Sequence, residues 1–268
     1  MKKIRCFPWL SLSLVLTCLT TLQVPAPSQA AIDPPRLAQT NPPPQEVQAF
    51  LTQLDAAASQ RNLEAVLKFY RSDFSNTDGL NRQTLEKVLS EFWKKYPTLT
   101  YRTELNAWQA TNNGFTLDTT TTITGQGKNG ARPLVLKAVL KTRQQVVDKQ
   151  ILSQQILAET TQITAGETPP TVQVNLPDQV KVGQDYNLDV IVQEPLGDSL
   201  LLGAAMEKPV AVDAYAKPVP VDLSLLSAGG LFKLGKAPAQ PGDQWISVAL
   251  IRDNGMTLIT HRLRVVKP

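Results

Sequence analysis

Two aspartates, Asp73 and Asp78, stand close together in FYRSDFSNTDGLNRQTLEKVLSEFW, which covers residues 69–93. They occupy a short break between two segments in which apolar residues recur at helical spacing. A carboxylate held in a pocket can act as a general base, whereas a carboxylate in a tight turn supports the backbone. The composition of SNTDG, with its permissive Gly79, favours the turn interpretation for both aspartates. Asp78 stays the alternative candidate for a catalytic base.

The rest of the chain offers few other groups for chemistry. Its one histidine, His261, lies in TLITHRLRVV, and no acidic or cysteine partner stands at the spacing of a metal or catalytic site. The sequence therefore predicts no metal and no cofactor. A set of aromatic residues could line a pocket for an apolar ligand or fill a core, and both interpretations stay open. These residues are Phe50, Tyr70, Phe74, Trp93, Tyr101 and Phe115.

The first thirty residues have the features of a secretory signal peptide. Three basic residues stand within the first five, residues 10–22 form an apolar run, and SQA supplies small residues before Ala31. We expect residues 1–30 to be removed and the protein to work in the periplasm or a thylakoid lumen. The apolar run is short for a membrane span, and no transmembrane span is expected after removal of the signal.

Removal of the signal changes the charge balance. The whole chain has a net charge of +4, and the signal holds three bases and no acid. About +1 remains on the mature chain, which argues against a nucleic-acid partner. Both cysteines, Cys6 and Cys18, lie in the signal. The mature protein therefore depends on apolar cores and has no disulfide.

Two proline-rich breaks divide the mature chain. AIDPPRLAQTNPPPQ predicts a linker over residues 31–43, and TAGETPPT predicts a second linker over residues 166–170. We expect folded domains over residues 44–165 and 171–268. Few contacts should cross the second break, because it holds two prolines and few apolar residues.

The first domain should combine helices with an antiparallel sheet. Apolar residues from Val47 to Ala58 recur on one helical face, Asn62 can cap a short helix, and Asn81 can cap a third. From residue 99 the apolar period becomes two, which predicts four long strands with turns at TNNG and GQGKNG. Helices followed by strands predict an α+β domain with helices on one face of the sheet. Strand parity places Asp118 opposite to Leu117, on the solvent face.

The second domain reads as an all-β sandwich. Seven short apolar runs follow one another at close spacing, from TVQVNL to MTLITHRLRVV. In RDNGMT, Asn254 and Gly255 are expected to form a type I′ hairpin turn, because both residues tolerate positive φ. An immunoglobulin-like sandwich without a disulfide is the predicted architecture.

The order of helix, short helix, FYRSDF, third helix and four long strands resembles the nuclear transport factor 2-like superfamily. The resemblance implies a curved sheet wrapped by helices into a cone with a pocket. A homodimer through the sheet of the first domain is a further expectation. The resemblance also brings Asp78 near the base position of ketosteroid isomerase-like members. The oxyanion tyrosine of such enzymes matches Phe50, which has no hydroxyl, and RPLVLKAVLK lacks the second donor, an acid. The His–Asp pair of related dehydratases has no counterpart here either.

These observations favour an exported, non-catalytic binding or assembly module that binds a protein partner or a small apolar ligand. The alternative is an exported isomerase, dehydratase or hydrolase that uses Asp78 as general base. If Asp78 is a turn residue, the Asp78→Asn substitution should change stability little, because asparagine also suits turns.

The signal peptide gives a direct prediction. Mass spectrometry of the protein from its native cell should show a new N-terminus at or near Ala31, because the SQA motif directs cleavage there. An intact Met1 in the mature pool would contradict export through this signal.

Overall fold

The structure is a computed structural model, and it describes residues 42–130, 132–195, 197, 199–215, 222–226 and 229–267. The expected signal peptide and most of the linker over residues 31–43 lie outside the described residues. Within the described part, no helix is long and apolar enough to cross a membrane.

Three helices lie in the first half of the described chain, and their ends follow from local sequence. They are α1 (Gln45–Ser59), α2 (Leu63–Leu67) and α3 (Arg82–Lys95). The Asn62 side chain caps α2 by accepting a hydrogen bond from the backbone N–H of Ala65. Asn81 and Thr84 form a reciprocal capping box at the start of α3. All three predicted helices are confirmed.

The expected strands are present, together with two that the sequence pattern did not show as strands, β1 and β10. The first half holds β1 (Tyr70–Asn76), β2 (Thr98–Thr111), β3 (Gly114–Asn129), β4 (Arg132–Val147) and β5 (Gln150–Gly166). The second half holds β6 (Val172–Asn175), β7 (Gln179–Lys181), β8 (Asp185–Val192), β9 (Leu201–Pro209), β10 (Ser224–Leu225), β11 (Gly230–Lys236), β12 (Gly242–Arg252) and β13 (Gly255–Val266), with the 3₁₀ turn η1 (Val212–Ala214). Asp73 lies in β1, so its expected turn position is wrong.

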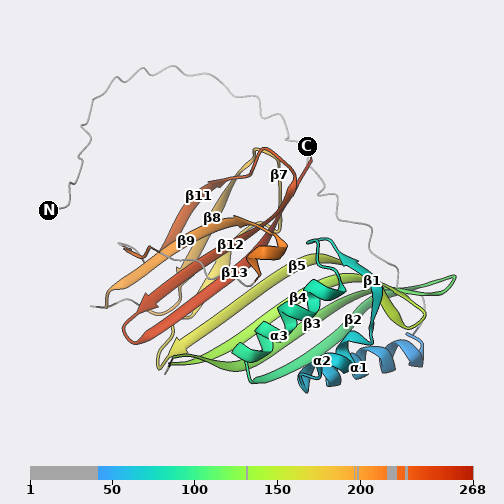
Figure 1. Cartoon of the computed structure of the whole chain (residues 1–268). Helices are drawn as coiled ribbons and strands as arrows, with labels where there is room; N and C mark the ends of the chain where they lie inside the picture. The colour runs from blue at the N-terminus through green and yellow to red at the C-terminus, as the bar shows by residue number, and fades with distance from the viewer. Residues whose placement is uncertain are drawn as a thin grey trace, which may run out of the picture. The chain divides into compact units, whose positions relative to one another are not determined.

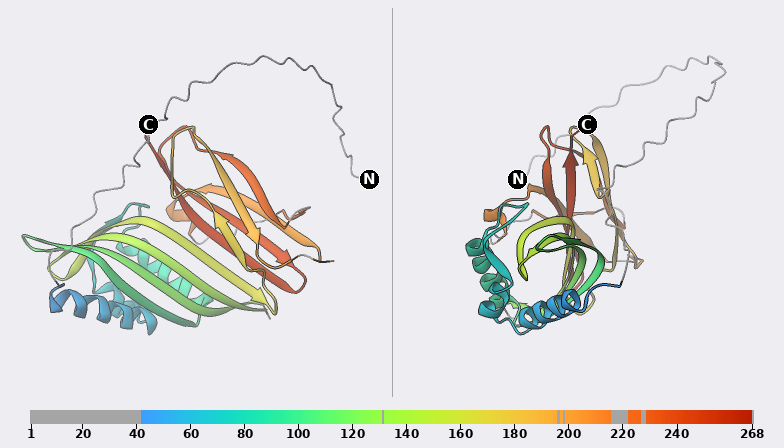
Figure 2. Two further views of the ribbon diagram at one scale, coloured as in Figure 1. Left: turned by 180° about the vertical axis from the view of Figure 1, so that it is seen from behind. Right: turned by 90° about the vertical axis from the view of Figure 1, so that its right-hand side faces the viewer.

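Most strands belong to one continuous sheet (Figure 1). Its order is β10-β9-β12-β13-β5-β4-β3-β2, with β1 parallel to β5 and β7 parallel to β13. The strands β2 to β5 curve, and the helices lie on the open side of the curve, as Figure 2 shows. Helices packed on an antiparallel sheet agree with the α+β prediction for the first half.

Helix α1 protects the exposed edge of this sheet. β2 is the edge strand, and two of its backbone N–H groups donate to side chains of α1. Thr103 N–H donates to Asp55 Oδ2 at 2.6 Å, and Tyr101 N–H donates to Ser59 Oγ at 2.9 Å. These bonds satisfy groups that would otherwise pair with another chain.

In the second half a three-stranded sheet, β11-β8-β6, packs against the larger sheet. The two sheets share a core whose buried members include Leu188, Val190, Leu201, Ile246, Leu250 and Leu263. Alternating apolar residues on both sheets supply this core, and the larger of the two sheets continues into the first half of the chain.

The two halves are joined by hydrogen-bonded strands. β13 pairs antiparallel with β5 from Gly255 opposite Gly166 to His261 opposite Thr160. The expectation that few contacts cross the break at residues 166–170 is therefore wrong. Prolines mark where the chain turns after β5. The backbone groups on the edge of β5 still need hydrogen-bond partners, and β13 supplies them.

The β12–β13 hairpin is present with a register that differs from the predicted one. Its turn residues are Asp253 and Asn254, because Arg252 pairs with Gly255. Asp253 has a positive φ of 49°, and Gly255 is the first residue of β13. Gly255 is needed for close packing, since a Cβ there would lie 2.1 Å from the carbonyl oxygen of Thr168.

Strand parity gave the correct face for Asp118 but the wrong environment. The Asp118 carboxylate forms an ion pair with Arg143 on the neighbouring strand, at 2.7 Å from Nε, and the residue is only 7% exposed. The expected solvent position is therefore wrong, because the cross-strand guanidinium covers the carboxylate.

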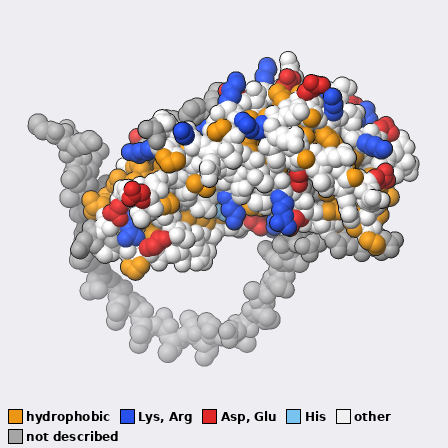
Figure 3. Space-filling model, turned by 90° about the horizontal axis from the view of Figure 1, so that it is seen from below, with side chains coloured by type: hydrophobic (Ala, Val, Ile, Leu, Met, Phe, Trp, Pro, Cys, Tyr) orange, Lys and Arg blue, Asp and Glu red, His pale blue; other side chains and the backbone are white. Residues whose placement is uncertain are grey.

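One face of the surface shows how the charges are distributed. Figure 3 shows basic and acidic side chains interspersed on this face, with small apolar areas between them. On the face drawn, the basic side chains do not gather into the continuous patch that binding to a nucleic-acid backbone requires.

The close approach at Gly255 gives a prediction for stability. Gly255→Ala should lower the free energy of unfolding by about 1–3 kcal/mol, because a methyl group must displace the Thr168 backbone. Gly229→Ala is the control, since no atom lies within 4 Å of a Cβ at that position. Urea unfolding of both variants measures the difference, and equal midpoints would contradict the close packing of β13 against the chain after β5.

Candidate functional site

The larger of two described pockets is an open groove of about 520 Å³ beside α1. The groove also borders the turns that join β2 to β3 and β4 to β5. Its apolar lining comes from Val47, Ala49, Phe50, Ala110, Phe115, Leu117 and Val146, and its charged members are Glu46, Asp148 and Lys149. The apolar side chains form most of its wall, and the charged ones come from the first turn of α1 and from the β4–β5 turn.

Backbone geometry holds the two turns together at one end of the groove. Asp148 and Lys149 both have positive φ, 50° and 62°, as a type I′ hairpin turn requires. The Asp148 N–H donates to the carbonyl of Asn113 in the other turn, at 3.1 Å. Gly114 allows the strands to approach, because a Cβ there would lie 2.0 Å from the Val146 carbonyl oxygen. The end of the groove is thus fixed by backbone contacts.

The structure divides the six aromatic candidates. Phe50 and Phe115 line the groove. The other four pack in the cores under the helices, and none of them borders the groove. Phe74 is 1% exposed and meets the ring of Tyr70 edge-on, with centroids 4.8 Å apart.

The remaining aromatic pair is joined by a hydrogen bond inside the core. Trp93 Nε1 donates to the hydroxyl of Tyr101 at 3.0 Å. Burial raises the pKa of Tyr101 to about 12, although the bond from Trp93 lowers it in part. Burial likewise raises the pKa of Tyr70. These phenols therefore stay protonated at neutral pH and serve as packing groups.

The two aspartates of the sequence analysis have different environments. Asp73 is on β1 with its side chain 57% exposed, and Arg71 Nε donates to it at 2.9 Å. The hydrogen bond from Arg71 lowers the pKa of Asp73. Asp78 instead follows β1 in a turn, with its side chain 3% exposed. The sequence analysis assigned both aspartates to a turn, whereas the structure places only Asp78 in a turn.

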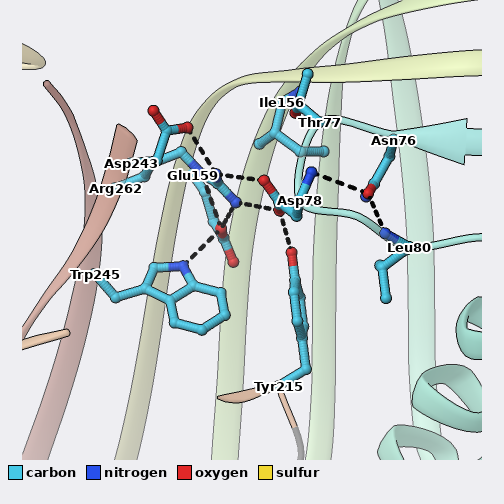
Figure 4. Close-up of polar contacts among 10 residues, drawn as sticks. All are labelled: Asn76, Thr77, Asp78, Leu80, Ile156, Glu159, Tyr215, Asp243, Trp245 and Arg262. Carbon is cyan, nitrogen blue, oxygen red and sulfur yellow. Dashed lines mark hydrogen bonds and ion pairs between the residues drawn. The ribbon is translucent and has the colours of Figure 1, made fainter. Parts of the chain in front are cut away.

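The turn that holds Asp78 is fixed by one asparagine. Asn76 Oδ1 accepts hydrogen bonds from the backbone N–H groups of Asp78, at 3.0 Å, and Leu80, at 2.7 Å. Gly79 has a φ of +85° and closes the turn. These contacts aim the Asp78 carboxylate toward β13, as Figure 4 shows.

Arg262 on β13 is the centre of a cluster of charges. Its guanidinium is 0% exposed and donates to Asp78 through two parallel bonds, Nη1 to Oδ1 at 2.9 Å and Nη2 to Oδ2 at 2.7 Å. Nη1 also donates to Asp243 Oδ2 on β12, and Nη2 to Glu159 Oε2 on β5, at 2.8 and 2.9 Å. We call Arg262 and these three carboxylates the Arg262 cluster.

Two aromatic residues complete the Arg262 cluster. The Tyr215 hydroxyl donates to Asp78 Oδ2, and Trp245 Nε1 donates to Glu159 Oε2 at 3.1 Å. Burial and then the negative charge of Asp78 raise the pKa of Tyr215, so it stays a donor. Burial alone would lower the pKa of Arg262, but its bond with Asp78 and the charge of Glu159 outweigh burial and raise it.

This arrangement argues against Asp78 as the base of an enzyme in the groove. Both of its oxygens accept hydrogen bonds from Arg262, and one also accepts from Tyr215. The residue does not line the groove that holds Phe50. Sequence reasoning missed Arg262, because a charged residue alternating with apolar ones on a strand reads as a solvent-facing residue.

Metal chemistry has no candidate ligand set in the described residues. No group of three histidine, cysteine, aspartate or glutamate side chains there is placed to hold a metal ion. The three carboxylates that converge on Arg262 surround its guanidinium. His261 lies on β13 with its Nδ1 3.2 Å from Thr160 Oγ1, and burial lowers its pKa.

Comparison with known proteins gives partial matches. Residues 167–266 match a family model described as a domain of unknown function, DUF8623. No curated protein matches the chain.

Three solved structures resemble part of the chain at low sequence identity. Bd1075 of Bdellovibrio bacteriovorus has 13% identity and a TM-score of 0.32, over 42% of this chain and 39% of that one. A candidate scytalone dehydratase of Novosphingobium aromaticivorans has 8% identity and a TM-score of 0.36, over 42% and 80%. A hypothetical protein of Catenulispora acidiphila with a ketosteroid isomerase-like fold, in complex with trimethylamine, has 14% identity and a TM-score of 0.29, over 40% and 82%. The chain thus spans less than half of Bd1075, and likenesses this weak decide neither fold nor function.

The Arg262 cluster reverses the expected effect of changing Asp78. Arg262→Met should lower the free energy of unfolding by about 3–5 kcal/mol, because three carboxylates lose their shared partner. Asp78→Asn should cost less, about 1–3 kcal/mol, because Arg262 keeps Glu159 and Asp243. Urea unfolding at neutral pH measures both changes.

Asp73→Asn is the control from the same segment. It removes an exposed carboxylate whose contact is with Arg71, so its unfolding midpoint should stay close to that of the wild type. If Asp78→Asn behaves like Asp73→Asn, the stabilising role of the Arg262 cluster is contradicted.

Proposed function

We propose that this protein is an exported, non-catalytic binding module whose ligand site is the groove beside α1. The observation that supports the proposal most directly is the groove itself, with a volume of about 520 Å³ and a mainly apolar wall. Ligand pockets in proteins commonly have volumes of ~300–1,000 Å³ and apolar linings with a few polar groups. A small apolar ligand with a polar end fits this description.

The lining of the groove favours binding over catalysis. Phe50 stands where a ketosteroid isomerase-like site would need a hydroxyl donor, and it offers only a ring. The titratable residues that line the groove are two acids, Glu46 and Asp148, and one base, Lys149. No histidine is among the lining residues. Such a rim can orient a polar end group without supplying the matched acid and base of proton transfer.

The domain assignment forms part of the same proposal. Residues 44–165 would be a nuclear transport factor 2-like domain with a cone, and residues 171–268 an immunoglobulin-like β-sandwich. Residues 1–30 would direct export to the periplasm or a thylakoid lumen. The order of helices and strands in the first half supports the first assignment, and the two facing sheets support the second. A protein partner, or a second copy of the chain docked on the sheet of the first domain, would bind in addition to the ligand in the groove.

Filling the groove should weaken ligand binding. Ala110 lines the groove and is exposed, so Ala110→Trp should occupy ligand volume without removing a buried side chain. We expect an affinity at least tenfold weaker for apolar fluorescent probes, a change of about 1.4 kcal/mol. Fluorescence titration of the mature protein with a set of such probes measures it.

Phe232→Ala is the control for general surface apolarity. Phe232 is 58% exposed on β11 and does not line the groove. Its variant should bind the probes as the wild type does. Unchanged binding by Ala110→Trp, or loss of binding in Phe232→Ala alone, would show that the groove is not the ligand site.

A further inference from the structure

A second, polar pocket of about 290 Å³ lies beside the Arg262 cluster. It is bordered by the turn that follows β1 and by β5, β12 and β13. Its polar lining comes from Thr77, Asp78, Gln155, Asp243 and Arg264. Its volume equals that of ~10 waters, which suits a small ligand rather than a lipid or a peptide.

Arg264 is the feature of this pocket that calls for a ligand. It stands directly opposite Asp243 in the pairing of β12 with β13. Cross-strand residues of opposite charge ordinarily pair with each other. Here, however, Asp243 Oδ2 accepts from Arg262 at 2.8 Å, and no carboxylate of the described residues lies within 4.0 Å of the Arg264 guanidinium nitrogens. A guanidinium is therefore left available at the pocket.

Other polar atoms of the pocket are also available for a ligand. Asp243 uses Oδ2 for Arg262, and its Oδ1 has no hydrogen-bond partner among the described residues. The Thr77 hydroxyl accepts from Ile156 N–H at 3.2 Å, which leaves its own hydrogen free to donate. Gln155 is a further residue that lines the pocket. The pocket thus offers donors from Arg264 and Thr77 and an acceptor from Asp243.

The signs of the charges limit the class of ligand. A simple anion attracted to Arg264 would face the carboxylates of Asp243 and Asp78. A metal cation attracted to these carboxylates would face the guanidiniums of Arg264 and Arg262. A molecule that carries an ammonium and a carboxylate a few bonds apart satisfies both signs at once, because each of its charges meets the opposite one.

We propose that this pocket binds a free α-amino acid. The carboxylate of the ligand would lie against Arg264, and its ammonium against Asp243 Oδ1. The Arg262 cluster and Arg264 together carry three carboxylates and two guanidiniums, so one negative charge stays uncompensated. Amino acids with a cationic side chain should therefore bind more tightly than neutral ones, and acidic ones least. The site is separate from the apolar groove and does not depend on the proposed function.

Calorimetric titration of the full mature chain tests the proposal. Lysine should bind more tightly than alanine, and alanine more tightly than glutamate. Alaninamide lacks the carboxylate and N-acetylalanine lacks the ammonium, so each should bind at least tenfold more weakly than alanine. Tight binding of N-acetylalanine would show an anion site instead, and binding of alaninamide equal to that of alanine would exclude the role of Arg264. Both results overturn the proposal, as does the absence of binding by every amino acid tested.

Variants show whether the titration reports this pocket. Arg264→Gln should weaken lysine and alanine binding at least tenfold and leave thermal unfolding nearly unchanged, because Arg264 has no ion pair with any of the described residues. Gln155→Met keeps the side-chain length, and it should weaken binding severalfold. The control Arg61→Gln removes a guanidinium at the junction of α1 and α2 and should bind as the wild type does. If both pocket variants bind amino acids as tightly as the control does, the pocket is not the site.

Discussion

Burial of the Arg262 guanidinium requires segments far apart in the chain to meet at one point. A charge removed from water is strongly destabilising unless ion pairs and hydrogen bonds replace its hydration. Arg262 is 0% exposed and reaches Asp78, Glu159 and Asp243 at distances of 2.7 to 2.9 Å. These carboxylates come from the turn after β1, from β5 and from β12. The three segments therefore have to meet at β13 before the guanidinium can be buried at an acceptable cost.

The Arg262 cluster lies where the two halves share one sheet. β5 presents Glu159 to Arg262 next to the point where its pairing with β13 begins, at Thr160 opposite His261. The proline-rich segment after β5 is tied into the same region, because Thr257 Oγ1 donates to the carbonyl of Pro170 at 2.6 Å in a buried position. The proline-rich composition of this segment therefore does not mark a gap in the packing between the two halves.

Sequence periodicity predicted the helices and most strands because these elements are set by residues close together in the chain. The caps at Asn62 and Asn81 are of this kind, and both are present. Contacts between distant residues leave no such signal. Asp78 and Arg262 are 184 positions apart, and neither has a local pattern that indicates its partner. The sequence therefore supplied the turn that holds Asp78 but could not supply the charge that the turn faces.

Strand parity has a related limit, which Asp118 and Arg262 illustrate. Parity assigns a side chain to one face of a sheet, but it does not show what covers that face. Asp118 faces outward and is still covered by its ion pair with Arg143. Arg262 occupies the parity opposite to Leu263, and the turn that carries Asp78 and the residue after η1, Tyr215, cover it. Burial at both positions is a property of the assembled fold.

Both candidate ligand sites lie along β5. Lys149 in the turn before β5 borders the groove, whereas Gln155 on β5 borders the polar pocket, about 20 Å further along an extended strand. Over this stretch β5 is paired on one side with β4 and on the other with β1. Coupling between two sites requires an element with two arrangements that both ligands bias. Hydrogen-bonded neighbours on both edges resist displacement of β5, although each pairing has a register shift here, so we expect ligands in the groove and in the pocket to bind independently of each other.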